Sequence, residues 1–361
     1  MTQKSTGTHP ENPEFQALRK YSAFIGSNTS LVQGAGGNTS IKLDGVMWIK
    51  ASGTWLKNAR QENQFVPVLY EPLLQAVSDS DPRAETSVDF VVQASNPSGL
   101  RPSIETTVHA LLPQRVVLHV HCIKTISLAV QTHGEMRLNE LLARFSWSWI
   151  PYVRPGLTLA KKIQQHMKDG SNVLVLGNHG LVVAADTVEA ANRLLEQIVG
   201  ALTITPRVAP QPDLAMLEHF CANSQYRLPK HTSAHAVACD ASSLSIAAGG
   251  SLYPDHVIFL GEGSTIAKDN ETAQQVADRF MRHGMPPPAS ILFPNAGVLM
   301  RADANPGQEA LAQCLADVCL HIDSGCQINY FTTSQNYELL NWEAEVYRQK
   351  LEADKQTSKE D

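Results

Sequence analysis

The run Val116–Cys122 constrains the fold of this chain more than any other part of the sequence, since two histidines interrupt an otherwise β-branched and apolar segment. A short apolar run of this kind predicts a buried strand. Side chains alternate between the two faces of a strand, so His119 and His121 point to the same face. The two imidazoles can therefore reach one metal ion.

A third histidine follows a second buried run. Residues Val173–Leu176 predict a strand that leads into Gly-Asn-His-Gly at 177–180. Two glycines around His179 allow the backbone to bend sharply and present the imidazole at the strand end. Three neutral imidazoles with an open fourth position match the ligand set of a catalytic zinc site. The alternative is that these are three unrelated histidines, of which one or more are hydrogen-bonded in the core.

A carboxylate precedes these histidines in the sequence. Glu105 begins a predicted helix, Glu105–Leu112, and Ser103 can cap that helix. Beside a divalent ion, a carboxyl group can move protons on a substrate whose oxygens the ion holds. The alternative is a capping acid with no chemical role. His109 shares a helix face with Glu105, and core packing is favoured over a place in the site.

A glycine-rich segment, Gln33–Ser40, is a candidate phosphate site. Backbone amides left open by glycine, with amide and hydroxyl side chains, can hold a phosphate dianion. The segment lacks the GxxxxGK[ST] pattern and fails the GxGxxG spacing at Thr39, so no nucleotide loop is indicated. The alternative is a plain turn that enters a hairpin. A second turn, Lys50–Thr54, can add anion donors. Lys50 is the nearest candidate for a Schiff-base lysine, and its position at a strand end is equally explained by solvent exposure.

Strand and helix patterns alternate along the chain, and the fold class is mixed α and β. Asp44-Gly45 between two apolar runs is typical of a β-hairpin. In the C-terminal part, the run Val257–Leu260 predicts a strand. The other predicted strands are Thr39–Leu43, Val46–Lys50, Leu181–Ala184 and Ile291–Phe293. The predicted helices are Glu14–Ile25, Thr187–Val199, Leu214–Asn223, Glu271–Arg282, Gly307–His321 and Asn336–Leu351.

Two domains are expected. The larger one, 14–205, contains the three histidines and the carboxylate. A connection at 206–234 contains four prolines, which are typical of a segment between domains. A smaller α/β domain of unknown role follows at 235–352.

The composition indicates which kinds of partner the protein can bind and in which cellular compartment it is expected. The formal net charge of −6 provides no positive field for a nucleic-acid backbone. The uncharged apolar runs are far shorter than the roughly 20 residues that cross a bilayer, and the N-terminus lacks the apolar core of a secretory signal. The 6 cysteines include no CxxC pair, which predicts free thiols in a reducing compartment. We therefore expect a cytoplasmic protein that binds neither nucleic acid nor a membrane.

Five segments, taken in order, resemble the class II aldolase/adducin family, which includes fuculose-1-phosphate and rhamnulose-1-phosphate aldolases. They are GAGGNTS, KASGTWL, PSIETTVHALLP, VVLHVH and VLGNHGLVV. The resemblance covers residues 14–200. Within the family, these segments look most similar to the aldolase portion of bifunctional rhamnulose-1-phosphate aldolase/alcohol dehydrogenases.

This resemblance implies an αβα fold around a central, mainly antiparallel sheet. It implies that His119, His121 and His179 bind a divalent metal ion, zinc in the family, and that Glu105 is the acid/base residue. It also implies a small phosphorylated sugar as substrate, and homotetramers with each site at a subunit boundary. The positions that bind substrate phosphate in the family correspond to Asn38, Ser52, Gly53 and Ser103.

Two positions and one spacing depart from the family pattern. They weaken the inference of a family substrate more than the inference of a metal site. Ile104 stands where some relatives have a second phosphate-binding serine, and Cys122 stands where proline is common. In addition, only nine residues separate His109 from His119, fewer than in the fuculose-phosphate enzymes.

The sequence therefore predicts a metal-dependent carbon–carbon lyase that cleaves or forms a phosphorylated ketose through an enediolate. Epimerisation, decarboxylation and dehydration of a sugar phosphate use the same kind of site and remain alternatives. A non-catalytic, adducin-like binding module is an alternative of a different class. Imidazole ligands also suit manganese and iron, so the zinc prediction rests partly on the resemblance.

Overall fold

The computed structural model describes residues 12–343. Within them the chain forms two compact units. The first unit contains residues 12–120, 145–174 and 181–198, and the second contains residues 121–144, 175–180 and 199–343. The last part of the predicted C-terminal domain (344–352) and of the predicted helix Asn336–Leu351 lies outside the described residues.

A seven-stranded sheet is formed by strands that all precede residue 186. Its order is β3-β2-β1-β4-β7-β6-β5, and the pairings from β3 through to β7 are all antiparallel. Asp44 and Gly45 take positive φ angles of 48° and 80° and turn β1 into β2, which confirms the predicted hairpin. The strands are β1 (Asn38–Leu43), β2 (Val46–Lys50), β3 (Phe65–Leu69), β4 (Val116–Val120), β5 (Trp147–Ile150), β6 (Val173–Leu176) and β7 (Gly180–Ala185).

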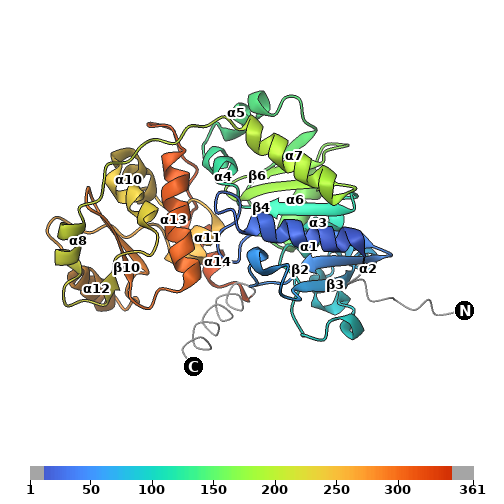
Figure 1. Cartoon of the computed structure of the whole chain (residues 1–361), viewed down its shortest axis with the longest axis horizontal. Helices are drawn as coiled ribbons and strands as arrows, with labels where there is room; N and C mark the ends of the chain where they lie inside the picture. The colour runs from blue at the N-terminus through green and yellow to red at the C-terminus, as the bar shows by residue number, and fades with distance from the viewer. Residues whose placement is uncertain (1–11, 344–361) are drawn as a thin grey trace, which may run out of the picture. The chain divides into compact units, whose positions relative to one another are not determined.

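Helices cover both faces of this sheet (Figure 1). On one face, the Phe15 ring of α1 lies 5.3 Å from the Trp48 ring and 5.4 Å from the Phe65 ring, measured between centroids. On the other face, α2, α3 and α6 share an apolar core with β2 and β3. These layers confirm the expected αβα arrangement. The helices of this part are α1 (Pro13–Gly26), α2 (Tyr70–Ser78), α3 (Thr106–Leu111), α6 (Leu157–His166) and α7 (Val188–Ala201).

The second unit is mainly helical, with a small antiparallel sheet in the order β8-β10-β9. Its strands are β8 (Tyr226–Arg227), β9 (Ser290–Phe293) and β10 (Gly297–Arg301). Its helices are α4 (Ile123–Ala129), α5 (Gly134–Leu141), α8 (Leu214–Cys221), α9 (Ala236–Cys239), α10 (Ala241–Ala248), α11 (Pro254–Leu260), α12 (Ala273–Arg282), α13 (Pro306–Leu320) and α14 (Thr333–Leu340).

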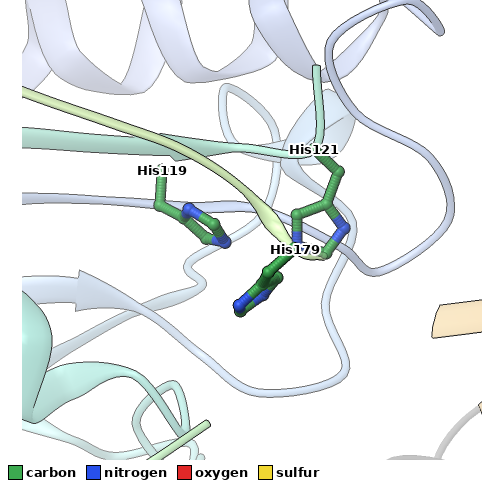
Figure 2. A group of neighbouring side chains, drawn as sticks. All are labelled: His119, His121 and His179. Atoms are coloured by element: carbon green, nitrogen blue, oxygen red, sulfur yellow. The ribbon is translucent and has the colours of Figure 1, made fainter. Parts of the chain in front are cut away.

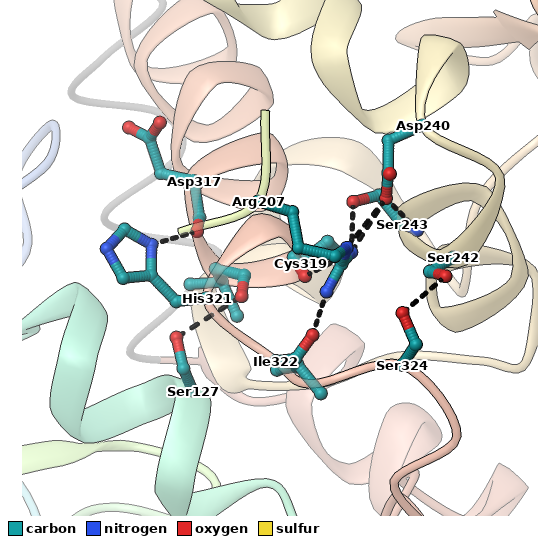
Figure 3. A network of polar contacts seen from close by, with 11 residues as sticks. Ser127, Arg207, Asp240, Ser242, Ser243, Asp317, Cys319, His321, Ile322 and Ser324 are labelled. Atoms are coloured by element: carbon teal, nitrogen blue, oxygen red, sulfur yellow. Dashed lines mark hydrogen bonds and ion pairs between the residues drawn. The ribbon is translucent and has the colours of Figure 1, made fainter. Parts of the chain in front are cut away.

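A network of polar contacts joins several helices of the second unit (Figure 3). The guanidinium of Arg207 donates to the carboxylate of Asp240 at 2.7 Å, to the carbonyl of Cys319 at 3.0 Å, and to the carbonyl of Ile322. The hydroxyl of Ser127 in α4 donates to the carbonyl of Val318 in α13 at 3.2 Å. These bonds connect α4 and α10 to the C-terminal end of α13.

The prediction of a strand at Val257–Leu260 is wrong, because these residues belong to α11 (Pro254–Leu260). All seven residues of α11 are buried, so the run carries no polar face that would reveal a helical period. Pro254 begins the helix, at a position where the missing N–H of proline has no cost.

The expected connection at 206–234 contains α8 and β8, and β8 pairs with β10. A search of the described residues finds no helix that combines the length and the apolarity needed to cross a membrane.

Candidate metal centre

Strand β4 fixes the positions of the first two histidines. His119 lies opposite Asn38 of β1 on one side and opposite Val182 of β7 on the other. His121 follows directly after the strand, two positions on, and the pleat turns both side chains to the same face. Both imidazoles are buried.

The turn between β6 and β7 carries the third histidine, and its bend differs from the one predicted. The sequence suggested that Gly177 and Gly180 bend the backbone, but the left-handed residue is Asn178, with φ of 52°. Asparagine tolerates this conformation better than most residues with a side chain. The amide of His179 donates to the carbonyl of Leu176 at 3.1 Å and closes the turn.

The three histidines lie together. One ring nitrogen from each of His119, His121 and His179 lies within 4.8 Å of the other two, and all three residues are buried. Figure 2 shows the side chains of His119 and His121 on the same side of β4. The side chain of His179, from the turn between β6 and β7, lies beside them. The rings of His121 and His179 meet at an angle of 61°, with centroids 5.3 Å apart. The group can hold one divalent metal ion.

A backbone contact sets the orientation of the His119 ring. Its Nδ1 lies 3.1 Å from the carbonyl oxygen of Leu181, which only accepts hydrogen bonds. Nδ1 therefore carries a proton, so Nε2 is the ring nitrogen that would coordinate an ion. An imidazole held in this way is ready to bind a metal ion through Nε2.

The carboxylate of Glu105 lies against the same histidine. Its Oε2 is 3.2 Å from His119 Nε2 and accepts a hydrogen bond of 2.8 Å from Asn38 Nδ2. Glu105 is 4% exposed and stands at the N-cap of α3, where its amide donates to the hydroxyl of Ser103 at 3.3 Å. A buried carboxylate is costly unless hydrogen bonds and charges compensate for lost water. Glu105 thus adjoins the histidine cluster and is held by β1.

The glycine-rich segment approaches β4 closely. Gly37 has φ of +60°, and a Cβ added there would lie 2.9 Å from the carbonyl oxygen of His119. A residue with a side chain would therefore meet both backbone strain and a clash. Lys50 holds the same segment by donating to the carbonyl of Ala35 at 3.0 Å. Of the two explanations for Lys50, solvent exposure is excluded, since the residue is 2% exposed.

The residues expected to bind phosphate lie on neighbouring backbone segments. The amide of Ser103 donates to the carbonyl of Lys50 at 3.1 Å, and the amide of Ser52 donates to the carbonyl of Arg101 at 3.0 Å. Gly53 follows with φ of 70°. These bonds bring the 50–54 turn beside the segment that leads to Glu105.

Asn38, also expected to bind substrate, contacts Glu105 directly. Its Oδ1 is buried and accepts no hydrogen bond within residues 12–343. A buried acceptor of this kind is a candidate contact for a bound molecule.

His109 lies outside the group of three histidines. It is fully buried, and its Nδ1 lies 2.7 Å from the hydroxyl of Ser40. Burial lowers the pKa of His109 to about 3 because it disfavours the charged imidazolium. This environment fits the interpretation of His109 as a core residue.

Two residues that contact this site escaped the sequence analysis. Asp255 of α11 places Oδ2 3.0 Å from Nδ1 of His121. The side chain of Asn178 donates to the carbonyls of Leu252 and Asn329. No local motif marks Asp255, because its partner lies far away in the sequence. The Asn-His pair in the turn was the only available signal for Asn178.

Comparison with known proteins gives three relevant relatives. The uncharacterized oxidoreductase YuxG of Bacillus subtilis is 31% identical over 183 residues, which are 46% of this chain and 26% of that protein, so the chain spans well under two thirds of this relative. The methylthioribulose-1-phosphate dehydratase of Bacillus pumilus is 31% identical over 162 residues, covering 37% of this chain and 76% of the dehydratase. The N-terminal class II aldolase domain of a conserved Thermoplasma acidophilum protein is 29% identical, covers 56% of this chain and 97% of that structure, and gives a TM-score of 0.47.

The model of the class II aldolase and adducin N-terminal domain matches residues 17–205. The match includes β4, the turn between β6 and β7, and the start of α3, so the three histidines and Glu105 all fall within it. Because the matched residues make up more than half of the 361-residue chain, the protein belongs to the class II aldolase/adducin family.

Proposed function

We propose that this protein is a zinc-dependent class II aldolase that cleaves or forms a phosphorylated ketose. The observation that carries the proposal is the buried cluster of His119, His121 and His179 with the Glu105 carboxylate 3.2 Å from His119. The aldolases of the family are lyases, and this site combines metal-ligand side chains with a group that can transfer a proton.

The donor atoms fit a divalent transition metal. Three imidazole nitrogens form the set found in catalytic zinc sites, where a fourth position stays open to water or substrate. The buried Oδ1 of Asn38 is an unused acceptor close to Glu105. Magnesium and calcium prefer oxygen ligands, so the nitrogen set favours zinc, with manganese and iron as chemically similar ions.

The reaction requires a proton to move at the carbon where the carbon–carbon bond breaks. When bound, the metal ion supplies positive charge for the substrate oxygens on which negative charge develops. Glu105 delivers or removes the proton at that carbon, and Asn38 holds Glu105 in place by its 2.8 Å hydrogen bond. Ser52, Gly53 and Ser103 bind the phosphate and thereby fix the position of the reacting carbon.

The decisive test is the substitution Glu105→Gln. Glutamine keeps the size of the side chain and one acceptor oxygen, but it cannot exchange a proton at neutral pH. We expect the variant to retain its metal content and to lose aldol cleavage by about 10²- to 10⁴-fold, the usual contribution of a general acid or base. Metal content is measured by elemental analysis, and cleavage by aldehyde release from a panel of phosphorylated ketoses.

Glu85→Gln is a matched control, because Glu85 is also a carboxylate of the first unit but pairs with Arg154. It should retain full activity. Full activity in Glu105→Gln would contradict the assigned role of Glu105. Normal activity in protein stripped of every divalent metal would contradict the metal-dependent mechanism.

Dehydration is the second candidate function, favoured by the similarity to methylthioribulose-1-phosphate dehydratase over 76% of that enzyme. Product analysis separates the two reactions, because aldol cleavage of a ketose 1-phosphate divides the carbon chain into dihydroxyacetone phosphate and an aldehyde. Dehydration keeps the carbon chain intact and releases water. Mass spectrometry of the products from methylthioribulose 1-phosphate and from several ketose 1-phosphates identifies which reaction takes place.

A non-catalytic, adducin-like binding role makes a different prediction for the metal. Such a module has no need for three converging imidazoles, so under this alternative the purified protein should contain no stoichiometric metal ion.

The proposed enzyme is expected to be a homotetramer, and light scattering measures this oligomeric state directly.

A further inference from the structure

The second ring nitrogen of His121 contacts a residue outside the family domain. Nδ1 of His121 lies 3.0 Å from Oδ2 of Asp255, which is in the first turn of α11. Asp255 is 2% exposed, and both residues belong to the second compact unit. The family match ends at residue 205, so no family motif supplies this carboxylate.

A carboxylate at Nδ1 has a specific consequence for an imidazole that binds a metal. The negative charge of an oxygen this close to Nδ1 favours the proton on that nitrogen, which leaves the lone pair on Nε2. It also fixes the ring's orientation and makes Nε2 more basic. The contact therefore prepares His121 to bind an ion through Nε2, on the side of the ring opposite Asp255.

The turn that carries His179 is held by the same C-terminal region. Nδ2 of Asn178 donates to the carbonyl of Leu252 at 2.9 Å and to the carbonyl of Asn329 at 2.6 Å. Leu252 lies three residues before Asp255, so one short segment contacts both histidine-bearing elements. These two bonds hold Asn178 in its left-handed conformation, and His179 follows directly.

His119 differs from the other two histidines in the origin of the contact that orients it. Its Nδ1 is held by the carbonyl of Leu181, which lies inside the family domain. Each histidine thus has a contact that orients its ring or its backbone, but for His121 and His179 the contact comes from residues after 250.

We propose that residues of the C-terminal region position two of the metal-binding histidines. Asp255 positions His121 directly. The carbonyls of Leu252 and Asn329 position His179 through Asn178. This inference rests on the proposed metal site and goes further, since it assigns a role to residues beyond the family domain. The opposing interpretation is that the His121–Asp255 pair only stabilises the fold. The two interpretations differ in what happens to metal affinity.

The experiment measures zinc affinity of the full chain by competition with a chromogenic chelator. Asp255→Ala removes the acceptor, and zinc should bind about 10- to 100-fold more weakly, the usual effect of losing such a partner. Asp255→Asn retains an acceptor and loses the charge, so a smaller loss is expected. Asp255→Glu retains the charge and should recover part of the affinity.

Glu309→Gln is the matched control for Asp255. Glu309 is also a buried carboxylate of the second unit, but it pairs with Arg227 and the amide of Lys230. This control should unfold at a lower temperature and bind zinc within twofold of the unsubstituted protein.

A second pair of variants tests the turn. Asn178→Gly tolerates the left-handed backbone and removes only the two side-chain bonds, so weaker zinc binding is expected. Asn270→Gly is its control, since Asn270 also has a positive φ, of 57°, but lies exposed on the surface. Zinc affinity should be unchanged in this control.

A spectroscopic readout does not depend on folding differences between variants. In metal-free protein at pH 8, two-bond ¹⁵N–¹H correlation spectra should show His121 protonated at Nδ1. Protonation at Nε2, or unchanged zinc affinity in a natively folded Asp255→Ala protein, would overturn the role of Asp255 and leave the metal site intact. If the unsubstituted protein binds no zinc, manganese or iron, the metal site itself is refuted.

Discussion

Buried polar side chains around the sheet have specific partners. Ser40 contacts His109, Lys42 donates to the carbonyl of Leu112, and Lys50 donates to the carbonyl of Ala35. Each of these bonds compensates for lost hydration, and each ties β1 or β2 to a neighbouring segment. The same principle applies to Glu105, whose partners also belong to the proposed reaction centre. Structural and chemical roles therefore meet in the same strands.

His109 makes the stability of the protein depend on pH. Its pKa is about 3 in the folded chain and about 6.5 in an unfolded one, so between these values the unfolded state binds one proton more. The stability that neutral His109 contributes is complete above pH 6.5 and is lost as the pH falls. This residue should lower the free energy of unfolding by about 1.4 kcal/mol per pH unit in that range. Urea unfolding at several pH values between 4.5 and 7.5 measures the slope.

His109→Gln removes the titrating group. In this variant the free energy of unfolding should therefore change less steeply with pH, by the amount that one bound proton contributes. His283→Gln is the control, because His283 is exposed and its hydration changes little on unfolding. Equal slopes for the protein and His109→Gln would show that His109 is not held neutral.

The sequence predicted the three clustered histidines because both signals are local: alternation along one strand and a histidine in a tight turn. Glu105 was noted at the start of a predicted helix, but its assignment as the acid/base residue rested on the family resemblance. The partner of His121 could not be predicted, since the contact with Asp255 depends on packing between distant segments. Asn178 is held by the backbone carbonyls of Leu252 and Asn329, and a backbone contact does not depend on which side chain the residue carries.

At the scale of elements, the close approach between the glycine-rich segment and β4 shapes the site. The 33–37 segment reaches the carbonyl of His119 because Gly37 has no Cβ. The hairpin between β1 and β2 was predictable, since Asp-Gly encodes its turn within two residues. The α11 helix was not, because all of its residues are buried and its run is equally consistent with a strand.

Two glycine substitutions separate backbone strain from steric contact. Gly37 and Gly45 have φ of +60° and +80°, but a Cβ at Gly45 would meet nothing within 4 Å. Gly45→Ala should lower the free energy of unfolding by about 1–2 kcal/mol through strain alone. Gly37→Ala adds the clash with His119, so a loss of roughly 2–5 kcal/mol is expected. Urea unfolding measures both values.

Gly37→Ala should also weaken zinc binding, because the clash displaces the backbone of His119, a proposed ligand. Gly45→Ala should leave zinc binding unchanged. If both variants lose the same stability and bind zinc equally, the close approach at Gly37 plays no part in forming the site.

At the scale of the whole molecule, the compact units do not follow the family boundary. The family match ends at residue 205, but the unit that contains the C-terminal helices also takes in residues 121–144 and 175–180. The first of these segments begins with His121, and the second contains His179. The C-terminal region therefore packs with the segments that bear two of the three clustered histidines, and these contacts lie outside the family motifs.

Metal binding should consequently stabilise the whole protein. An ion that binds only the folded state, at a free concentration 100 times its dissociation constant, adds about 2.7 kcal/mol to the free energy of unfolding. The melting temperature should rise by several degrees with zinc and return to its starting value when a chelator is added. His179→Asn should lose most of this rise, whereas the exposed His283→Gln should keep all of it. Since imidazole binds a metal only when neutral, acid should also reduce the rise. A melting temperature that zinc leaves unchanged at neutral pH would mean that the three rings bind no ion.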